Sequence, residues 1–546
     1  MARVVLDPVT RIEGHLRIET EVSNGKVASA WSTSPLFRGI EPILKDRDPR
    51  DAWMITQRLC GVCTYVHGVT SIRSVENSLQ ITIPENARII RNLLMGAQFI
   101  HDHLVNFYQL HLLDWVDVVS ALSADPAKAV TVDNQINSAR TRTTSYFSAI
   151  KQQLAAFANS GQLGPFNNGY WGHPAYILTP EENLVFMANY LEALKAQKEV
   201  AHMHAIYGGK NPHPQTMIVG GVTLNKDLTS TRITEFRNHV TAAQSFVNTY
   251  YLPDTTYLLG RYKDYVNYGP AENLMSFGEF PLSSSEPSSL FFPRGAIFNR
   301  STSSVQPVDV NNISEHITHS WYQGSSSRNP AQGETVPNYS GLDTAGQYSW
   351  IKAPRYQGQP MEVGPLARVM VNYGKRHSAT KTQVDAFLRK LGLSLSAMYS
   401  SLGRTAARAI ETKVIADAMV SWAGQVRATT PSTSAMPNRK SFSMASSGSG
   451  VGLNEAPRGA LGHWVNYSNQ KITNYQMVVP STWNFGPRDA NDVPGPVEAS
   501  LKDVPVADEA RPLEVLRVIH SFNPCIACAV HVFDPNRKST FEVTAQ

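Results

Sequence analysis

Apolar and polar positions alternate near the start of the chain, from Leu16 to Val22 and again after Val27. Asn24-Gly25 stands between the two runs, and this dipeptide favours the two-residue turn of a β-hairpin. The pattern therefore predicts a β-rich segment over about residues 1–35.

Over much of the remaining chain, apolar residues recur at steps of three and four, which is typical of amphipathic helices. After Pro84 this spacing extends from Ile89 to His111 and predicts a long helix. Further helices are expected at residues 134–156, 227–251, 379–400 and 403–427, with a break between the last two at Gly403.

One helix carries explicit start and stop signals. Thr179-Pro180-Glu181-Glu182 combines an N-cap residue, a proline at the first helical position and two acids in the first turn. We expect this helix to extend to about Tyr207 and to end at Gly208-Gly209.

Two long segments, residues 322–350 and 429–450, are rich in Ser, Thr, Gly, Asn and Pro and are predicted to be loops. There is no internal repeat and no clear linker. The pattern as a whole predicts a mainly α protein: one large multi-helical domain with long central helices and peripheral β-hairpins and sheets. Two closely packed halves are the alternative.

Composition narrows the class of protein. Charged residues make up 17% of the 546 residues, against about 25% in a typical globular protein, which suggests a large interior or a surface covered by a permanent partner. The net charge is only +5 and the chain has no basic arm, so nucleic acid is not an expected partner. The sequence shows neither an export signal at its start nor an apolar run long enough to span a membrane.

All four cysteines fall in two C-x-x-C pairs, and a histidine follows each pair. Cys60 and Cys63 precede His67, while Cys525 and Cys528 precede His531, near the other end of the chain. A single such pair could be half of a zinc site or a redox dithiol. Two pairs that converge would form a four-thiolate site for zinc, iron or nickel.

The segments around these pairs make the interpretation more specific. Together with the two cysteine motifs, five further blocks resemble, in the same order, the large subunits of nickel–iron (NiFe) hydrogenases. These blocks are Asp7–His15, Phe37–Glu41, Gly208–Pro214, Glu455–His463 and Val479–Asn484, and the resemblance extends from residue 7 to residue 531. It implies the NiFe hydrogenase large-subunit fold and reversible cleavage of H2 to protons and electrons.

The resemblance also implies how the cysteines share the metals. All four would bind nickel, and Cys63 and Cys528 would also bridge to an iron that carries carbon monoxide and two cyanides. Cys60 and Cys525 would be terminal ligands, with Cys525 as the proton acceptor. H2 is a very weak acid, so its cleavage requires a Lewis-acidic metal and a nearby base. A structural four-cysteine zinc site is the alternative on spacing alone.

The same resemblance assigns roles to residues around the cysteines. His67 would donate a hydrogen bond to a bridging thiolate. Arg458, held in a turn after Pro457, would lie over the iron and pair with Asp102. Ser481 would hydrogen-bond one cyanide.

Further residues are implied in proton transfer and in a second metal site. Glu13 would accept the proton from Cys525. Glu41 and His531, with the backbone carbonyl near Met477, would bind a buried Mg²⁺, although Mg²⁺ ordinarily prefers oxygen donors.

The sequence departs from the family pattern two residues before Cys525, where Asn523 replaces the usual aspartate. An amide can still accept one hydrogen bond from Arg458, but it carries no charge. The pocket should then be more positive, and we expect activity to survive with altered kinetics.

The end of the chain and its cysteine content imply partners. By resemblance, residues 1–531 form the catalytic domain, and residues 532–546 are a maturation peptide that an endopeptidase removes. Because no cysteine remains for iron–sulfur clusters, these must lie in a small subunit, which makes a heterodimer. Relatives are exported to the periplasm with that subunit, which can also attach them to the membrane.

Two other functions would fit the same motifs. One is a hydrogen-sensing regulatory subunit with little turnover; such sensors generally lack the cleaved tail. The other is a respiratory-complex subunit of shared ancestry that has lost its metal, against which the four retained cysteines argue.

Overall fold

The N-terminal segment forms a three-stranded antiparallel sheet in the computed structural model, which describes residues 2–161, 164–166, 169–429 and 436–529. Strand β2 (Arg17–Ser23) pairs with β1 (Ala2–Leu6) on one side and with β3 (Lys26–Thr33) on the other. Asn24 (φ 53°) and Gly25 (φ 70°) both adopt left-handed backbone between β2 and β3, which a two-residue turn of this kind requires. The predicted hairpin is confirmed.

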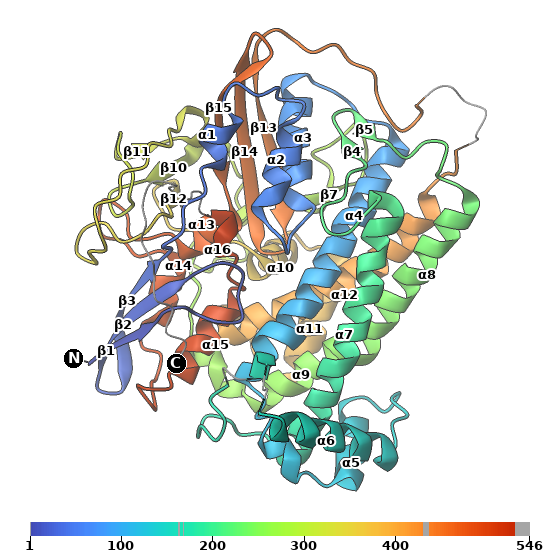
Figure 1. Ribbon diagram of the computed structural model, residues 1–546, viewed down its shortest axis with the longest axis vertical. Coiled ribbons are helices and arrows are strands. Elements are labelled where there is room, and N and C mark those ends of the chain that lie inside the picture. The colour runs from blue at the N-terminus through green and yellow to red at the C-terminus, as the bar shows by residue number, and fades with distance from the viewer. Residues whose placement is uncertain (1, 162–163, 167–168, 430–435, 530–546) are drawn as a thin grey trace.

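Four long helices run side by side (Figure 1). They are α4 (Glu85–Leu104), α7 (Pro180–Gly208), α8 (Ser230–Phe246) and α12 (Ser401–Gln425), with α8 at the edge of the molecule. Every residue of α12 from Ser401 to Thr412 is buried, as expected of a helix surrounded by other helices. The mainly α fold with long central helices is therefore confirmed.

Helix α7 begins and ends where its sequence signals predict. The Thr179 hydroxyl accepts a hydrogen bond from Glu182 N, and the Glu182 carboxylate accepts one from Thr179 N, which completes a capping box. Gly209 ends the helix with left-handed backbone (φ 80°).

Two predicted helix boundaries are wrong. The stretch 134–156 is two helices, α5 (Pro126–Ile136) and α6 (Thr144–Asn159), because the Asn137 side chain accepts from Ala139 N and the Thr143 side chain caps α6. The break assigned to Gly403 lies earlier, where Gly392 (φ 66°) ends α11 (Ser378–Leu391).

Gly403 instead lies in the first turn of α12. Its N–H donates to the Ser400 hydroxyl, and a Cβ at this position would lie 1.9 Å from the Met398 carbonyl oxygen. The glycine allows a close backbone approach and does not interrupt the helix.

A second antiparallel sheet, of order β13-β14-β15, was missed in the sequence. It consists of β13 (Gly448–Ala456), β14 (Gly459–Ser468) and β15 (Lys471–Val478), and β13 packs on helix α3 (Val66–Ser78). The predicted polar loop 429–450 overlaps only the first residues of β13. The other predicted loop, 322–350, is confirmed as mostly irregular chain.

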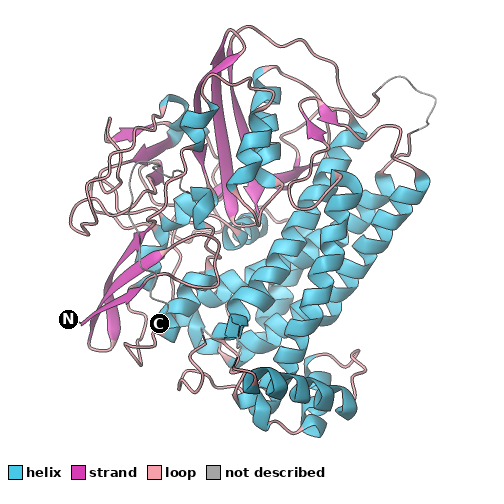
Figure 2. Ribbon diagram, in the orientation of Figure 1, coloured by secondary structure: helices cyan, strands magenta, loops and turns pink. Residues whose placement is uncertain are grey.

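Shorter elements complete the fold (Figure 2). The remaining α-helices are α1 (Ile40–Leu44), α2 (Ala52–Thr56), α9 (Leu252–Arg261), α10 (Pro365–Gly374), α13 (Pro480–Phe485), α14 (Pro496–Leu501), α15 (Leu513–Ser521) and α16 (Ile526–Ala529). The remaining strands are β4 (Met217–Ile218), β5 (Gly221–Val222), β6 (Leu274–Ser276), β7 (Glu279–Pro281), β8 (Leu290–Phe292), β9 (Gly295–Ile297), β10 (Ile313–His316), β11 (Ser327–Arg328) and β12 (Ala353–Tyr356). Among the described helices, none combines the length and apolar character needed to cross a bilayer.

Candidate metal centre

The two cysteine motifs meet in the interior although they lie near opposite ends of the chain. Cys60 and Cys63 precede α3, and Cys525 lies between α15 and α16. The sulfur atoms of Cys60 and Cys525 are 3.4 Å apart, and all three sulfurs lie within 4.8 Å of one another. Each of the three side chains is at most 4% exposed. Such a group of buried sulfurs has the donor chemistry of a soft metal site.

The side chains of two predicted ligands, Cys528 and His531, lie outside the described residues. Cys528 lies in α16, but its side chain is outside the described residues, as is all of His531. Their predicted roles therefore remain predictions.

Backbone groups hold the sulfurs in position. The amides of Val62 and Cys63 point at Cys60 Sγ, at 3.3 and 3.0 Å, and such N–H donors favour the thiolate form. Cys525 N donates to Ser481 Oγ at 3.1 Å. Ser481, predicted to contact a cyanide, thus also fixes the backbone of a predicted ligand.

Glu13 lies directly beside Cys525. The Cys525 thiol donates to Glu13 Oε2 at 3.2 Å, and Ala527 N donates to the same oxygen at 3.1 Å. Ile526 N donates to the Glu13 carbonyl at 2.8 Å. Gly14 follows with left-handed backbone (φ 85°), and a Cβ there would lie 2.4 Å from Ala527 N. This close approach explains the Glu-Gly step in the block Asp7–His15.

The environment of Glu13 favours its protonated form. Burial raises the pKa of Glu13 above its ordinary value, and the negative charge of Cys60 raises it further. The hydrogen bond from Cys525 and the charge of Arg458 oppose this shift. A carboxylate with a raised pKa is a stronger base, which suits it to receive a proton from a thiol.

Arg458 is held from two sides. Its Nη1 lies 3.2 Å from Asp102 Oδ2, on α4, and its Nη2 donates to Asn523 Oδ1 at 3.2 Å. Its Nε donates to the Asn523 carbonyl at 3.0 Å. Burial opposes the charge of Arg458, but the negative Cys525 and Asp102 hold its pKa above the usual range. The carbonyl of Pro457 accepts from Arg368, which fixes the turn.

Asn523 meets the geometric expectation for an amide in place of a carboxylate. Its side-chain oxygen accepts from Arg458, while its Nδ2 is buried and has no hydrogen-bond partner within the described part of the chain. Its backbone is left-handed (φ 56°), a conformation that asparagine and aspartate tolerate better than other residues with a side chain.

His67 begins a chain of hydrogen bonds that leads away from the cysteines. His67 Nδ1 lies 3.2 Å from His463 Nε2, and His463 Nδ1 lies 2.8 Å from the Tyr475 hydroxyl. The other ring nitrogen, His67 Nε2, is buried with no partner among the described residues. Burial lowers the pKa of His67 to about 4, so the ring is neutral near pH 7. Sequence reasoning missed His463 and Tyr475, although His463 ends a block that the family resemblance includes.

The predicted Mg²⁺ residues Glu41 and Met477 are brought together. Glu41 is buried; its Oε1 accepts from Met477 N at 2.8 Å, and its Oε2 accepts from the Thr335 hydroxyl. Glu315 lies nearby, with its Oε2 3.5 Å from Lys352 Nζ. Buried carboxylates of this kind suit Mg²⁺, but in the described residues the contact from Met477 is its N–H, not its carbonyl. No pattern in the sequence marked Glu315 or Lys352.

A small cavity adjoins the cysteines. Its lining residues come from four segments of the chain: Cys63, Val66, His67, Ala456, Arg458, Val479, Pro480, Ser481 and Cys525. Sulfur donors, a fixed positive charge and an unpartnered ring nitrogen thus surround one space. This donor set fits a soft metal, and the charge of Arg458 fits anionic ligands on it.

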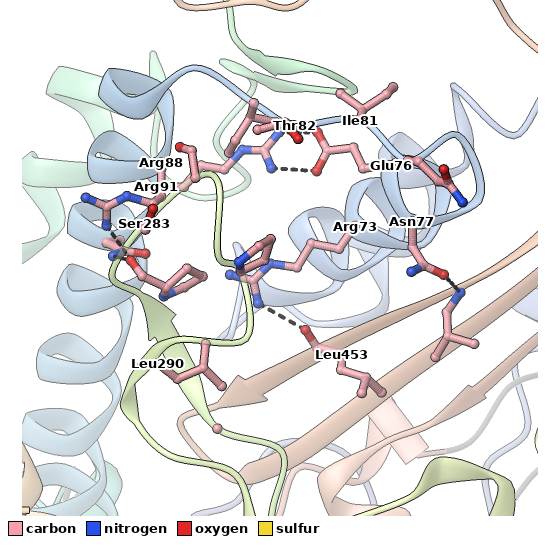
Figure 3. Close-up of a pocket in the computed structure, with 18 of the residues that line it drawn as sticks. Arg73, Glu76, Asn77, Ile81, Thr82, Arg88, Arg91, Ser283, Leu290 and Leu453 are labelled. Carbon is pink, nitrogen blue, oxygen red and sulfur yellow. Dashed lines mark hydrogen bonds and ion pairs between the residues drawn. The ribbon is translucent and has the colours of Figure 1, made fainter.

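A larger cavity lies elsewhere, between α3, the start of α4 and the β7–β8 hairpin (Figure 3). Arginines line it, and two of them are paired with carboxylates: Arg91 Nη2 lies 2.7 Å from Glu76 Oε1, and Arg73 Nη2 lies 2.7 Å from Glu279 Oε1. None of its lining residues is a cysteine or a histidine. The candidate metal centre is therefore at the cysteines.

Comparisons with known proteins indicate one family for nearly the whole chain. Residues 38–531 match the family model "Nickel-dependent hydrogenase", and residues 3–32 match one described as "HoxL-like". The chain is 46% identical to the uptake hydrogenase large subunit of Bradyrhizobium diazoefficiens, over 99% of this chain and 97% of that protein. It is 42% identical to the hydrogenase-2 large chain of Escherichia coli K12, over 99% of each.

Two solved hydrogenase structures align with nearly the whole chain. The reduced Ni-Fe-Se hydrogenase of D. vulgaris Hildenborough aligns with a TM-score of 0.81 and 32% identity, over 97% of this chain and 100% of that one. The Ni-Fe-Se hydrogenase of Desulfomicrobium baculatum in a reduced, active form aligns with a TM-score of 0.79 and 31% identity, over 97% and 100% of the two chains.

Proposed function

We propose that this chain cleaves H2 heterolytically at a nickel–iron centre. The chain belongs to the nickel-dependent hydrogenase family, as a large subunit, and is therefore an oxidoreductase acting on H2. Cys60, Cys63, Cys525 and Cys528 would hold that centre. When bound, it supplies the Lewis acidity and the redox capacity that H2 cleavage needs.

The residues of the chain would divide the remaining work. Cys525 passes a proton to Glu13, whose oxygen already lies 3.2 Å from the sulfur. Arg458 keeps a positive charge beside the cysteines, held there by Asp102 and Asn523. His67 lines the cavity together with Cys63, and its Nε2, which has no partner among the described residues, would donate a hydrogen bond to the bridging thiolate.

The observation that carries the proposal is the convergence of three buried cysteine sulfurs with Glu13 and Arg458 from four distant segments. A structural zinc site would need the sulfurs but not a carboxyl group that receives a thiol proton. The large subunit should contain about one nickel and one iron, and the purified enzyme should show infrared bands of bound carbon monoxide and cyanide and reduce a dye with H2. Zinc in place of nickel, with no such bands, would overturn the proposal.

We also propose a small subunit that carries the iron–sulfur clusters. Its support is that the chain has four cysteines, all of them assigned to the proposed centre, and that the relatives are named large subunits or large chains. Co-purification of a tagged chain with a second polypeptide that contains iron and acid-labile sulfide would test this. Two relatives are named uptake hydrogenases, which favours H2 oxidation as the direction in the cell.

The remaining assignments are proposals on the family resemblance. A Mg²⁺ would lie at Glu41, with Met477 and His531. Residues 532–546 would be removed by an endopeptidase, and the heterodimer would lie in the periplasm, with any attachment to the membrane made through the partner. Intact-mass measurement of active enzyme tests the cleavage, since retention of residues 532–546 at full activity would contradict it.

A further inference from the structure

A second group of metal-ligating side chains lies on the surface, where α7 and α8 run side by side (Figure 1). Glu199 and His202 are three residues apart on α7 and therefore project from the same face of that helix. His239 projects from α8 towards them. One ligand atom from each residue lies within 4.8 Å of the other two.

Both histidine rings approach the same oxygen of Glu199 at more than the usual hydrogen-bond length. His239 Nδ1 lies 3.4 Å and His202 Nδ1 lies 3.7 Å from the same oxygen, Glu199 Oε2. Both distances exceed the usual length of about 2.9 Å for a hydrogen bond of this kind. Ligands about 2.0–2.1 Å from a tetrahedral zinc ion are about 3.3 Å from one another, which is close to the observed separations.

We propose that Glu199, His202 and His239 form a binding site for a divalent late-transition-metal ion, zinc(II) by the chemistry of the donors. Two imidazole nitrogens and one carboxylate are a donor set that zinc accepts, whereas Mg²⁺ and Ca²⁺ prefer oxygen alone. The ion would join α7 to α8.

The three side chains are exposed enough for a metal ion to reach them from solvent. The side chains of Glu199 and His202 are 50% and 46% exposed, and that of His239 is 18% exposed. An ion can therefore enter from solvent, and water can take the fourth position. The site lies outside the candidate metal centre, because none of its residues lines the cavity at the cysteines.

Zinc titration of the purified heterodimer, after dialysis against a chelator, tests the proposal. Isothermal calorimetry should show a binding event that His202→Ala and His239→Ala each weaken by at least about tenfold, since each removes one of three protein ligands. Ni²⁺ should bind at the same site and Mg²⁺ should not. Asn238→Ala and Lys198→Ala, at exposed neighbouring positions, are the matched controls and should bind zinc as the unchanged protein does.

A second measurement separates metal binding from a loss of structure. Co²⁺ in place of zinc should give the visible absorption of a tetrahedral site, and this absorption should be absent in both histidine variants while their H2 oxidation is unchanged. Zinc should also raise the melting temperature of the unchanged heterodimer, because an ion that binds only the folded form stabilises it. Equal zinc affinity in all variants, or no binding to the unchanged protein, would overturn the proposal.

Discussion

At the scale of single residues, the contact between Cys525 and Glu13 is the step most open to direct test. Glu13→Gln keeps the shape of the side chain and its hydrogen bond from Ala527 N, but the amide cannot take up a proton. Turnover in H2 oxidation should fall by about 10²–10⁴-fold, the usual contribution of a positioned base, while the nickel and iron content stays the same.

The control for Glu13→Gln is Glu13→Asp, which keeps the carboxyl group but moves it about one methylene away from the sulfur. This variant should retain more turnover than Glu13→Gln. If Glu13→Gln were as active as the unchanged enzyme, the proton would have to leave Cys525 by another route.

His67, His463 and Tyr475 form a chain whose hydrogen positions depend on one another. If His67 Nε2 donates towards a thiolate, the neutral ring must accept a hydrogen bond at Nδ1. His463 is then the donor, from its Nε2, and its Nδ1 accepts from the Tyr475 hydroxyl at 2.8 Å. Tyr475→Phe leaves His463 Nδ1 buried without this donor and should cost about 1–3 kcal/mol of unfolding free energy. It should also shift the infrared bands of the carbon monoxide and cyanide ligands.

Tyr467→Phe is the matched control for Tyr475→Phe. Tyr467 is also buried in the same sheet, and its hydroxyl lies 2.9 Å from Ser78 Oγ, in a chain of contacts that does not include His67. Tyr467→Phe should lower the free energy of unfolding without shifting the infrared bands of the carbon monoxide and cyanide ligands. A shift of equal size in both variants would mean that the bands report general loosening and not the orientation of His67.

Asn523→Asp restores the residue that the family pattern has at this position. A carboxylate would strengthen the hydrogen bond from Arg458 Nη2, now 3.2 Å from an amide oxygen, and would add a negative charge near the cysteines. We expect the variant to remain active, with a turnover that differs by a few-fold and with a shifted potential of the active state. Identical turnover and potential would show that the position is neutral.

Several residues that the motifs marked lie together in the structure, whereas the partners that contact them carried no signal in the sequence. Arg458, Asp102 and Asn523 meet as the family resemblance implies. Thr335, which contacts the predicted Mg²⁺ ligand Glu41, and Lys352, which lies 3.5 Å from Glu315, stand in a long polar loop and beside it. No periodicity or motif distinguishes one polar residue from another there.

At the scale of elements, the packing of β13 on α3 depends on alternate glycines. Gly448, Gly450 and Gly452 share one face of the strand, and a Cβ on each would approach Ser78, Ser74 or Thr70, which lie four residues apart along α3. Because α3 carries His67 and begins just after Cys63, this close contact also sets the position of the cysteine motif.

Gly452→Ala tests that contact, since its Cβ would lie 2.0 Å from the Thr70 carbonyl oxygen. Relief requires β13 and α3 to move apart, and overpacking of this kind costs about 1–3 kcal/mol or more. The melting temperature and the nickel content should both fall. The control is Gly424→Ala on α12, where a Cβ meets nothing within 4 Å, so that alanine should be neutral or slightly stabilising.

A helix whose own sequence carries capping residues and a terminal glycine could be predicted. A strand whose composition is set by close packing on another element could not. The cap at Thr179 and the glycine after α7 determined that helix locally. In contrast, β13 is rich in Gly and Ser because it must approach a helix, and such a composition is typical of loops. The break at residues 137–143 is stabilised by Arg140, which reaches Asp133 and Asp254 across the fold.

At the scale of the whole molecule, the two ends of the chain are held together at the candidate metal centre. Thr10 and Glu13 contact the segment 520–527 through the His520 side chain and the backbone of Pro524 and Ile526, beside a buried apolar cluster that includes Val9, Phe522 and Ile526. The long helices α4, α7 and α12 have their own buried core. The ends should therefore depend on the metal far more than the helices do, because metal binding contributes directly to the stability of the segments that carry its ligands.

Hydrogen exchange of enzyme produced with and without nickel tests this division. Without nickel, amides in residues 10–15 and 520–527 should exchange faster, including that of Ile526, which donates to the Glu13 carbonyl at 2.8 Å. Amides of α4, α7 and α12 should keep their protection, since local opening does not require them to unfold. A uniform loss of protection would mean that the metal stabilises the whole domain as one unit, and unchanged exchange at the ends would mean that the polypeptide alone forms the site.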